Sequence, residues 1–142
     1  MQRILVATDG SPAADRAVDA AANIAKVTGA QLFILTVGGK IAGTELRQLA
    51  SSDGDLSKKL ESMVDEILSQ ARERALRAGV STVEVRSAWG DTAEEILDAA
   101  AREKVDILVV GRRGQSRLSG LLLGSVTQKM AVLAPCIVMV VP

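Results

Sequence analysis

Short apolar runs alternate along the chain with longer segments in which apolar residues recur every three or four positions. The runs are Ile4–Ala7, Leu32–Val37, Ile107–Val110 and Ile137–Val141, and each has the length and the Val, Ile and Leu content of a buried strand. The segments between them have the period of amphipathic helices. Strands separated by helices pair in parallel through right-handed crossovers, so this order predicts an α/β fold, an open parallel sheet with helices on both faces.

A fifth strand is expected at Val83–Arg86, where apolar and polar residues alternate. Alternation indicates that one face of a strand is exposed to water, so we place this strand at an edge of a five-stranded sheet. The segment 38–54 is rich in Gly and Ser, and it predicts a loop with one helical turn around Glu45–Leu49.

Local capping signals set the expected helix boundaries. Ser11 followed by Pro12 is typical of an N-cap and the first helical position, and Gly29 is placed to end the helix that they begin. Asp91 and Glu94 have the spacing of a capping box at the start of a later helix. These signals predict where helices begin and end without reference to the rest of the fold.

Two more helices are expected, a long one from Asp55 to a stop at Gly79 and a last one at about Ser125–Leu133. In the long helix, the apolar stripe that should face the sheet consists of Leu56, Leu60, Met63, Val64, Ile67, Ala71 and Ala75.

Length and composition narrow the class of protein. A chain of 142 residues is the common size of one domain, so residues 1–142 are expected to form a single domain. Aromatic residues make up 1% of the chain, and 17 basic and 17 acidic residues give a net charge of zero. Proteins that bind nucleic acid rely on aromatic platforms or a basic surface, so we expect no nucleic-acid partner. The absence of His removes the commonest general base and the commonest zinc ligand.

The single cysteine and the first residues of the chain indicate the cellular compartment in which the protein is expected. Cys136 cannot form an internal disulfide, which fits a reducing compartment, and we expect it to be a small buried hydrophobe, with a redox sensor as the lesser alternative. The chain begins with strand-like residues 2–7 instead of the apolar core of a signal peptide, and no apolar run approaches the about 20 residues of a membrane span. We therefore expect a cytoplasmic protein with no membrane partner.

The strongest chemical signal is the segment from Gly111 to Ser125, directly after the fourth strand. Gly111 and Gly114 let the backbone approach a ligand without an intervening Cβ atom. Gly124 and Ser125 begin a helix, whose free N–H groups and dipole favour a phosphate. The alternatives that need no ligand are a tight turn after a strand and a simple helix cap. A Walker A loop is not expected, because no Gly-Lys-Ser/Thr follows at the required spacing.

The glycines of this segment have the pattern Gly-x2-Gly-x9-Gly-Ser/Thr, formed by Gly111, Gly114, Gly124 and Ser125. This pattern resembles the ATP-binding signature of the universal stress protein family. Val6–Ser11 is similar to the family's opening, and the segments 106–111 and 122–126 are similar to its closing half, so the resemblance covers the whole chain. It implies a three-layer α/β/α fold of the adenine nucleotide alpha hydrolase-like type, with strand order 3-2-1-4-5, and a homodimer joined through the C-terminal strand.

The resemblance also implies a site for ATP, or for AMP or ADP, with Mg²⁺ or Mn²⁺ on the phosphates. In the family's nucleotide-binding branch, the glycine loop holds ribose and phosphates, and the adenine lies near the ends of the first two strands. Asp9 is expected to orient the nucleotide or its metal, with an Asx-type turn as the alternative. Carried over to this chain, the expected nucleotide-binding residues are Ala7, Thr8, Asp9, Val37, Val110, Gly111, Arg112, Gly114, Gln115, Gly124, Ser125 and Val126.

Two functions from different classes fit these residues. The leading hypothesis is an ATP-binding stress-response protein that acts as a regulatory switch or a partner-binding module. The alternative is a slow ATPase or an ATP-dependent transferase. Efficient phosphoryl transfer needs a residue that orients the attacking nucleophile, and the sequence identifies none, which favours binding over catalysis. We therefore assign no catalytic residue, and the metal ligands stay open, with Asp9 as a candidate.

Overall fold

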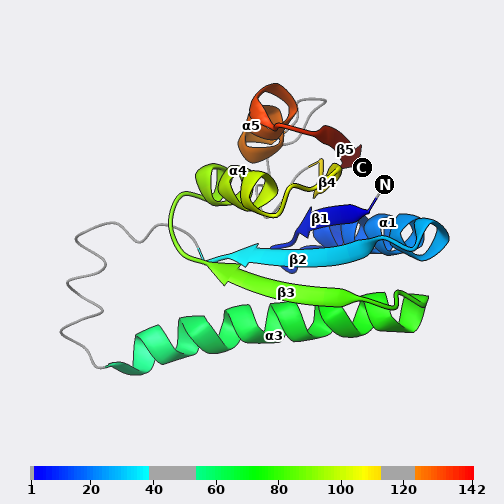
Figure 1. The fold of residues 1–142 in the computed structure, drawn as a ribbon. Helices are drawn as coiled ribbons and strands as arrows, with labels where there is room; N and C mark the ends of the chain where they lie inside the picture. Colours follow the sequence, from blue (N-terminus) through cyan, green and yellow to red (C-terminus); the bar gives the residue numbers. More distant parts are fainter. Residues whose placement is uncertain (1, 39–53, 113–123) are drawn as a thin grey trace.

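The computed structural model describes residues 2–38, 54–112 and 124–142, in which strands and helices alternate (Figure 1). In chain order the elements are β1 (Arg3–Ala7), α1 (Pro12–Thr28), β2 (Gln31–Val37), α3 (Gly54–Ala78), β3 (Val83–Ala88), α4 (Thr92–Arg102), β4 (Ile107–Gly111), α5 (Ser125–Leu133) and β5 (Ile137–Val141). The helical turn expected around Glu45–Leu49 lies outside the described residues.

The strands form one parallel sheet with the order β3-β2-β1-β4-β5. This order confirms the expected arrangement, including the edge position of β3. At the centre, Val6 of β1 lies between Ile34 of β2 and Val109 of β4. All three side chains are fully buried, as continuous apolar strands covered on both faces require.

Two helices cover each face of the sheet (Figure 1). Because successive side chains of a strand point to opposite faces, Ile4 and Val6 of β1 pack in the core under α1 and α3. Leu5 of the same strand packs in the second core, under α4 and α5. The chain is therefore a three-layer α/β/α sandwich, as expected.

The expected capping signals work as local devices in the structure. The Ser11 hydroxyl accepts a hydrogen bond from the Ala14 amide at 3.2 Å, and Gly29 ends α1 in the left-handed conformation with φ of 73°. The Asp91 carboxylate accepts from the Glu94 amide at 3.1 Å and caps α4. The boundaries of these two helices are thus set by their own sequence.

The buried stripe of α3 differs from the expected one. The residues that pack under the sheet are Val64, Leu68, Ala71 and Ala75, whereas Met63 is 60% exposed. Spacings of four, three and four residues keep these four side chains on one line, and Met63 lies one residue, or about 100°, away from that line.

Among the described residues, no helix is both long enough and apolar enough to cross a membrane.

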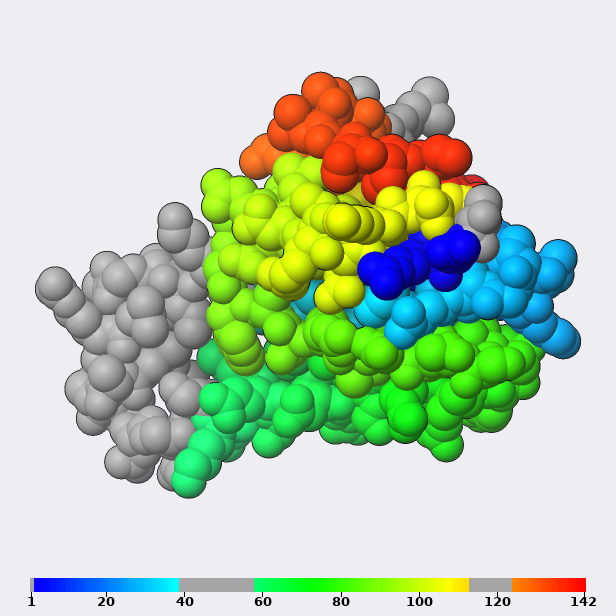
Figure 2. All heavy atoms as spheres, in the orientation of Figure 1, coloured from blue at the N-terminus to red at the C-terminus, as the bar shows by residue number. Residues whose placement is uncertain are grey.

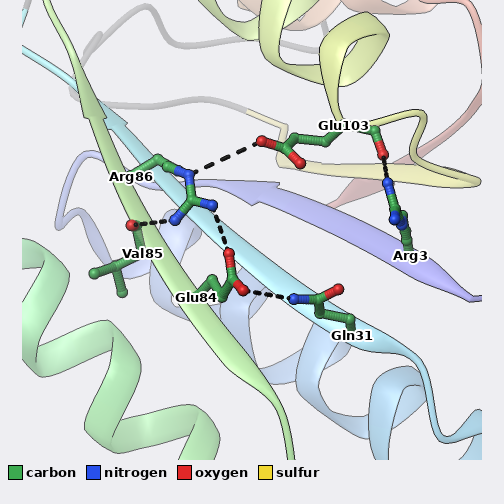
Figure 3. A network of polar contacts seen from close by, with 6 residues as sticks. All are labelled: Arg3, Gln31, Glu84, Val85, Arg86 and Glu103. Atoms are coloured by element: carbon green, nitrogen blue, oxygen red, sulfur yellow. Dashed lines mark hydrogen bonds and ion pairs between the residues drawn. The ribbon is translucent and has the colours of Figure 1, made fainter.

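The two edge strands of the sheet have opposite character. On β3, a polar network occupies the face toward the α4 layer: Arg86 pairs with Glu84 and Glu103, and Glu84 accepts from Gln31 (Figure 3). The Arg86 guanidinium also lies 5.8 Å from the centre of the Phe33 ring. Charged side chains of this kind discourage pairing of an edge strand with another chain.

The opposite edge strand, β5, consists of apolar residues only, and Ile137 at its start is 63% exposed. Figure 2 shows the orange and red surface of α5 and β5 on the opposite side of the molecule from the green surface of α3.

Cys136, just before β5, was expected to be buried, and the structure shows it half-buried. This burial raises the pKa of its thiol, which disfavours the reactive thiolate.

Candidate functional site

A pocket of about 270 Å³ opens at the carboxyl ends of the central strands, between the starts of α1, α4 and α5. Ligands of open parallel sheets bind at this edge, where neighbouring strands send their chains to opposite faces. The lining residues are Ala7, Thr8, Asp9, Ala14, Leu35, Val37, Thr92, Val110, Gly111, Gly124, Ser125, Val126 and Thr127.

The turn after β1 forms one wall of the pocket. The Asp9 carboxylate accepts a hydrogen bond from the Ser11 amide at 2.9 Å, and the Thr8 hydroxyl accepts from the Gly10 amide at 3.2 Å. Gly10 adopts a left-handed φ of 80°, which turns the chain toward α1. The Asx-type turn weighed as an alternative for Asp9 is therefore present, on a residue that also lines the pocket.

The end of β4 lies against the start of α1. A Cβ atom at Gly111 would lie 3.2 Å from the backbone carbon and oxygen of Ala13, so a side chain at this position would crowd the start of α1. From the sequence, we expect a glycine here because a ligand would approach the backbone. The structure adds that the close packing of β4 against α1 also favours glycine at this position. The Arg112 amide donates to the Val141 carbonyl at 2.6 Å, and the Gly124 amide donates to the Arg112 carbonyl at 3.1 Å.

These contacts hold the beginning of α5 beside the end of β4. The Thr127 hydroxyl, which is buried, donates to the Gly111 carbonyl at 2.8 Å and fixes the first turn of α5. Gly124 is the N-cap of α5 and has no side chain with which to cap the helix, in contrast to Ser11 in α1 and Asp91 in α4. With φ of −61° and ψ of 156°, Gly124 has an extended conformation that any residue can adopt. The N-terminus of α5 borders the pocket, and its N-cap residue has no side chain that could compete for the backbone N–H groups of the first turn.

The two sides of the pocket differ in chemistry. On the β2 side, the lining residues Leu35 and Val37 are apolar. On the β4 side, the pocket is bordered by the helix start at Gly124 and by the hydroxyl-bearing Ser125 and Thr127. The dipole of α5 adds partial positive charge on this side, so the pocket suits a ligand with an apolar ring at one end and an anion at the other.

The structure brings most of the expected binding residues together. Ala7, Thr8, Asp9, Val37, Val110, Gly111, Gly124, Ser125 and Val126 all line the pocket. Arg112 follows β4 with an exposed side chain and is not among the lining residues. Gly114 and Gln115 lie outside the described residues.

Sequence reasoning missed four lining residues: Ala14, Leu35, Thr92 and Thr127. Thr92 and Thr127 lie in the first turns of α4 and α5, and Ala14 lies in the first turn of α1. Their positions at helix starts that follow the carboxyl ends of strands were a usable signal.

In the parts of the chain that the structure describes, no three His, Cys, Asp or Glu side chains are grouped so as to hold a metal ion.

Comparisons with known proteins place the chain among proteins of known fold. The model of the universal stress protein family matches residues 1–142. The universal stress protein YxiE of Bacillus subtilis is 37% identical in a match of length 150 that includes 98% of this chain and 97% of that protein. The solved structure of the universal stress protein UspA from Lactobacillus plantarum has a TM-score of 0.87 at 25% identity, with 99% of this chain and 97% of that chain covered.

A second solved structure is described as a universal stress protein in complex with cAMP. It is 34% identical to this chain, has a TM-score of 0.76, and the match covers 99% of this chain and 97% of that one.

Proposed function

Because the chain belongs to the universal stress protein family, we propose that it binds an adenine nucleotide in the pocket at the carboxyl edge of the sheet and acts as a regulatory or partner-binding protein of the stress response. The observation that carries this proposal is the N-terminus of α5, whose N-cap residue is a glycine and which borders the pocket. A helix start without an N-cap side chain suits a phosphate, because its N–H groups and its dipole act on the same anion.

The likeness to a protein solved with cAMP supports an adenine nucleotide as the ligand. In the proposed arrangement, the phosphates lie at Gly124 and Ser125, and the adenine lies toward Val37, beyond the ends of β1 and β2. The apolar side chains on the β2 side fit the faces of a purine ring, and the helix start on the β4 side fits the anionic end.

ATP would carry Mg²⁺ or Mn²⁺ on its phosphates. Such ions are usually held by one or two carboxylates together with phosphate oxygens and water, and Asp9 is the acidic residue among the lining residues that the structure describes. Asp9 could therefore supply one carboxylate ligand to the ion on the phosphates, and the metal would screen the phosphate charge.

A homodimer through β5 belongs to the same proposal. The apolar edge of β5 has no polar protection of the kind seen on β3, and Val132, Leu133 and Ile137 nearby are exposed. Pairing of two β5 edges about a two-fold axis would cover these side chains. The expected cytoplasmic location is also part of the proposal.

Calorimetric titration with ATP and with cAMP tests the nucleotide site. Gly124→Val should abolish binding, because a branched side chain would stand where phosphate meets the helix start. The backbone of residue 124 has an ordinary conformation, so this variant should still fold, as circular dichroism would verify. Lys129→Ala, an exposed position in the same helix, is the matched control and should bind like the wild type. Unchanged affinity of Gly124→Val would remove the start of α5 from the site.

The alternative function, a slow ATPase or an ATP-dependent transferase, is separated from a binding role by turnover. We expect the wild type to bind ATP in the presence of Mg²⁺ without repeated rapid hydrolysis. Release of many equivalents of phosphate per protein within minutes would support the enzyme instead.

A further inference from the structure

Trp89 is the chain's single tryptophan, and it lies directly after β3 with 42% of its surface exposed. The six-membered ring of its indole rests on Gly38. A Cβ atom at residue 38 would fall 2.2 to 2.7 Å from three carbons of that ring, so the ring occupies the place of a missing side chain. The Gly38 amide donates to the Ala88 carbonyl at 2.8 Å, which ties the backbone on both sides of the contact.

Both chain segments that hold the indole continue into the pocket wall. Gly38 directly follows Val37, a lining residue on the β2 side. Trp89 is followed by the turn through Gly90 into α4, where Thr92 is again a lining residue. Neither Trp89 nor Gly38 is itself a lining residue, so the indole lies just beyond the lining, next to the end of β2 and three residues before Thr92 of α4.

We propose that Trp89 is the positioning residue for the base, with its indole forming the outer wall against which the adenine ring packs. This inference rests on the proposed nucleotide site and deepens it, because it says what holds the base. Leu35 and Val37 on the β2 side of the pocket are apolar, and an aromatic ring next to them offers a flat surface to a purine.

Stacking on an aromatic ring accepts any base, because every base has a π-face. Trp89 therefore contributes affinity for the base but no choice between adenine and guanine. Its effect is confined to ligands that carry a base, and the phosphate end of the pocket is independent of it. Gly38 is essential to this role, since a side chain at residue 38 displaces the indole.

The fluorescence of Trp89 reports on this contact directly, because no second tryptophan contributes to the signal. Titration of the wild type with AMP and ATP should quench or shift the emission with the same midpoint that calorimetry gives for binding. Inorganic tripolyphosphate, which has no base, should leave the emission unchanged.

Three variants complete the test. Trp89→Ala should weaken AMP and ATP binding by about tenfold, which corresponds to about 1.4 kcal/mol, and leave tripolyphosphate binding as it is. Gly38→Ala, which keeps the tryptophan but displaces the ring, should cause a comparable loss. Leu76→Ala is the matched control, since Leu76 is also 42% exposed but lies near the far end of α3, and it should bind like the wild type.

The outcomes separate this inference from the proposal on which it rests. If the wild type binds ATP while Trp89→Ala and Gly38→Ala bind it equally well, the inference is wrong and the nucleotide site stands. If the losses extend equally to tripolyphosphate, Trp89 supports the fold of the pocket and does not contact the base. If the wild type binds no nucleotide, both the site and the inference are overturned.

Discussion

The Asp9 carboxylate has a role in the fold and a proposed role in ligand binding. Its oxygen accepts a hydrogen bond from the Ser11 amide in the turn that leads into α1, and the same residue lines the pocket. A polar side chain at the end of a strand can serve both purposes, so a substitution to Ala removes two functions at once and cannot tell them apart.

Comparison of Asp9→Asn with Asp9→Ala separates the two roles. Asn keeps an oxygen acceptor for the Ser11 amide, so we expect it to unfold in urea almost like the wild type, while Ala should lose about 1 kcal/mol of stability with that hydrogen bond. Asn removes the negative charge, so the gain in ATP affinity that Mg²⁺ gives the wild type should disappear. An undiminished Mg²⁺ effect in Asp9→Asn would restrict Asp9 to the turn.

At the scale of the elements, the amino ends of β1 and β4 are joined at the edge of the sheet opposite the pocket. The Asp106 carboxylate accepts hydrogen bonds from the Gln2 amide at 2.7 Å and from the Arg3 amide at 2.9 Å. These two bonds hold the pKa of Asp106 below its ordinary value, because they stabilise the charged form. The Asp106 side chain thus links the beginning of β4 to the beginning of β1.

This lowered pKa predicts a pH dependence of stability. The unfolded chain takes up the Asp106 proton at a higher pH than the folded chain, so the stabilisation is complete above the ordinary carboxyl pKa and is lost as the pH falls through the lower, folded value. Urea unfolding from pH 6 down to pH 2 should show a smaller acid loss in Asp106→Asn than in the wild type. Asp98→Asn, exposed on α4, is the control and should follow the wild-type curve.

At the scale of the whole molecule, the sheet has one protected edge and one apolar edge. The hydrogen bonds between β4 and β5 show which residues of β5 point their backbone N–H and C=O groups toward β4. The Ile137 amide donates to the Asp106 carbonyl, and the Val141 carbonyl accepts from the Arg112 amide. The odd-numbered residues of β5 therefore bond to β4. Val138 and Val140 therefore present their N–H and C=O groups to the outer edge. By the same reasoning from the Gly38–Ala88 hydrogen bond, Ser87 faces outward on β3.

Proline at these outward positions tests the proposed dimer, since it removes an edge N–H donor without breaking a bond inside the sheet. Val140→Pro should convert a dimer to a monomer in sedimentation experiments at micromolar concentration. Ser87→Pro makes the same change at the opposite edge and should remain dimeric. A monomeric wild type would refute edge pairing through β5, and a dimeric Val140→Pro would move the interface elsewhere.

Much of this fold could be predicted from local patterns. Apolar runs and helical periodicity gave the elements in their correct order, and the caps at Ser11 and Asp91 gave two helix starts, because each of these signals depends on neighbours a few residues away. The prediction of the buried residues of α3 was partly wrong. Met63 and Leu68 are both apolar, and only the contact of the helix with the sheet decides which one is buried. That residues 1–142 form a single domain stays a prediction.

Local sequence patterns were enough to predict the elements, the edge position of β3 and the glycine pattern after β4, because these follow from short-range sterics and from exposure to water. The walls of the pocket could be identified only from the folded structure. Leu35, Thr92 and Thr127 come from separate strands and helices, and their meeting depends on strand order and helix docking. The contact of Gly111 with Ala13 likewise joins residues far apart in the chain, because close packing is settled only when the layers are assembled.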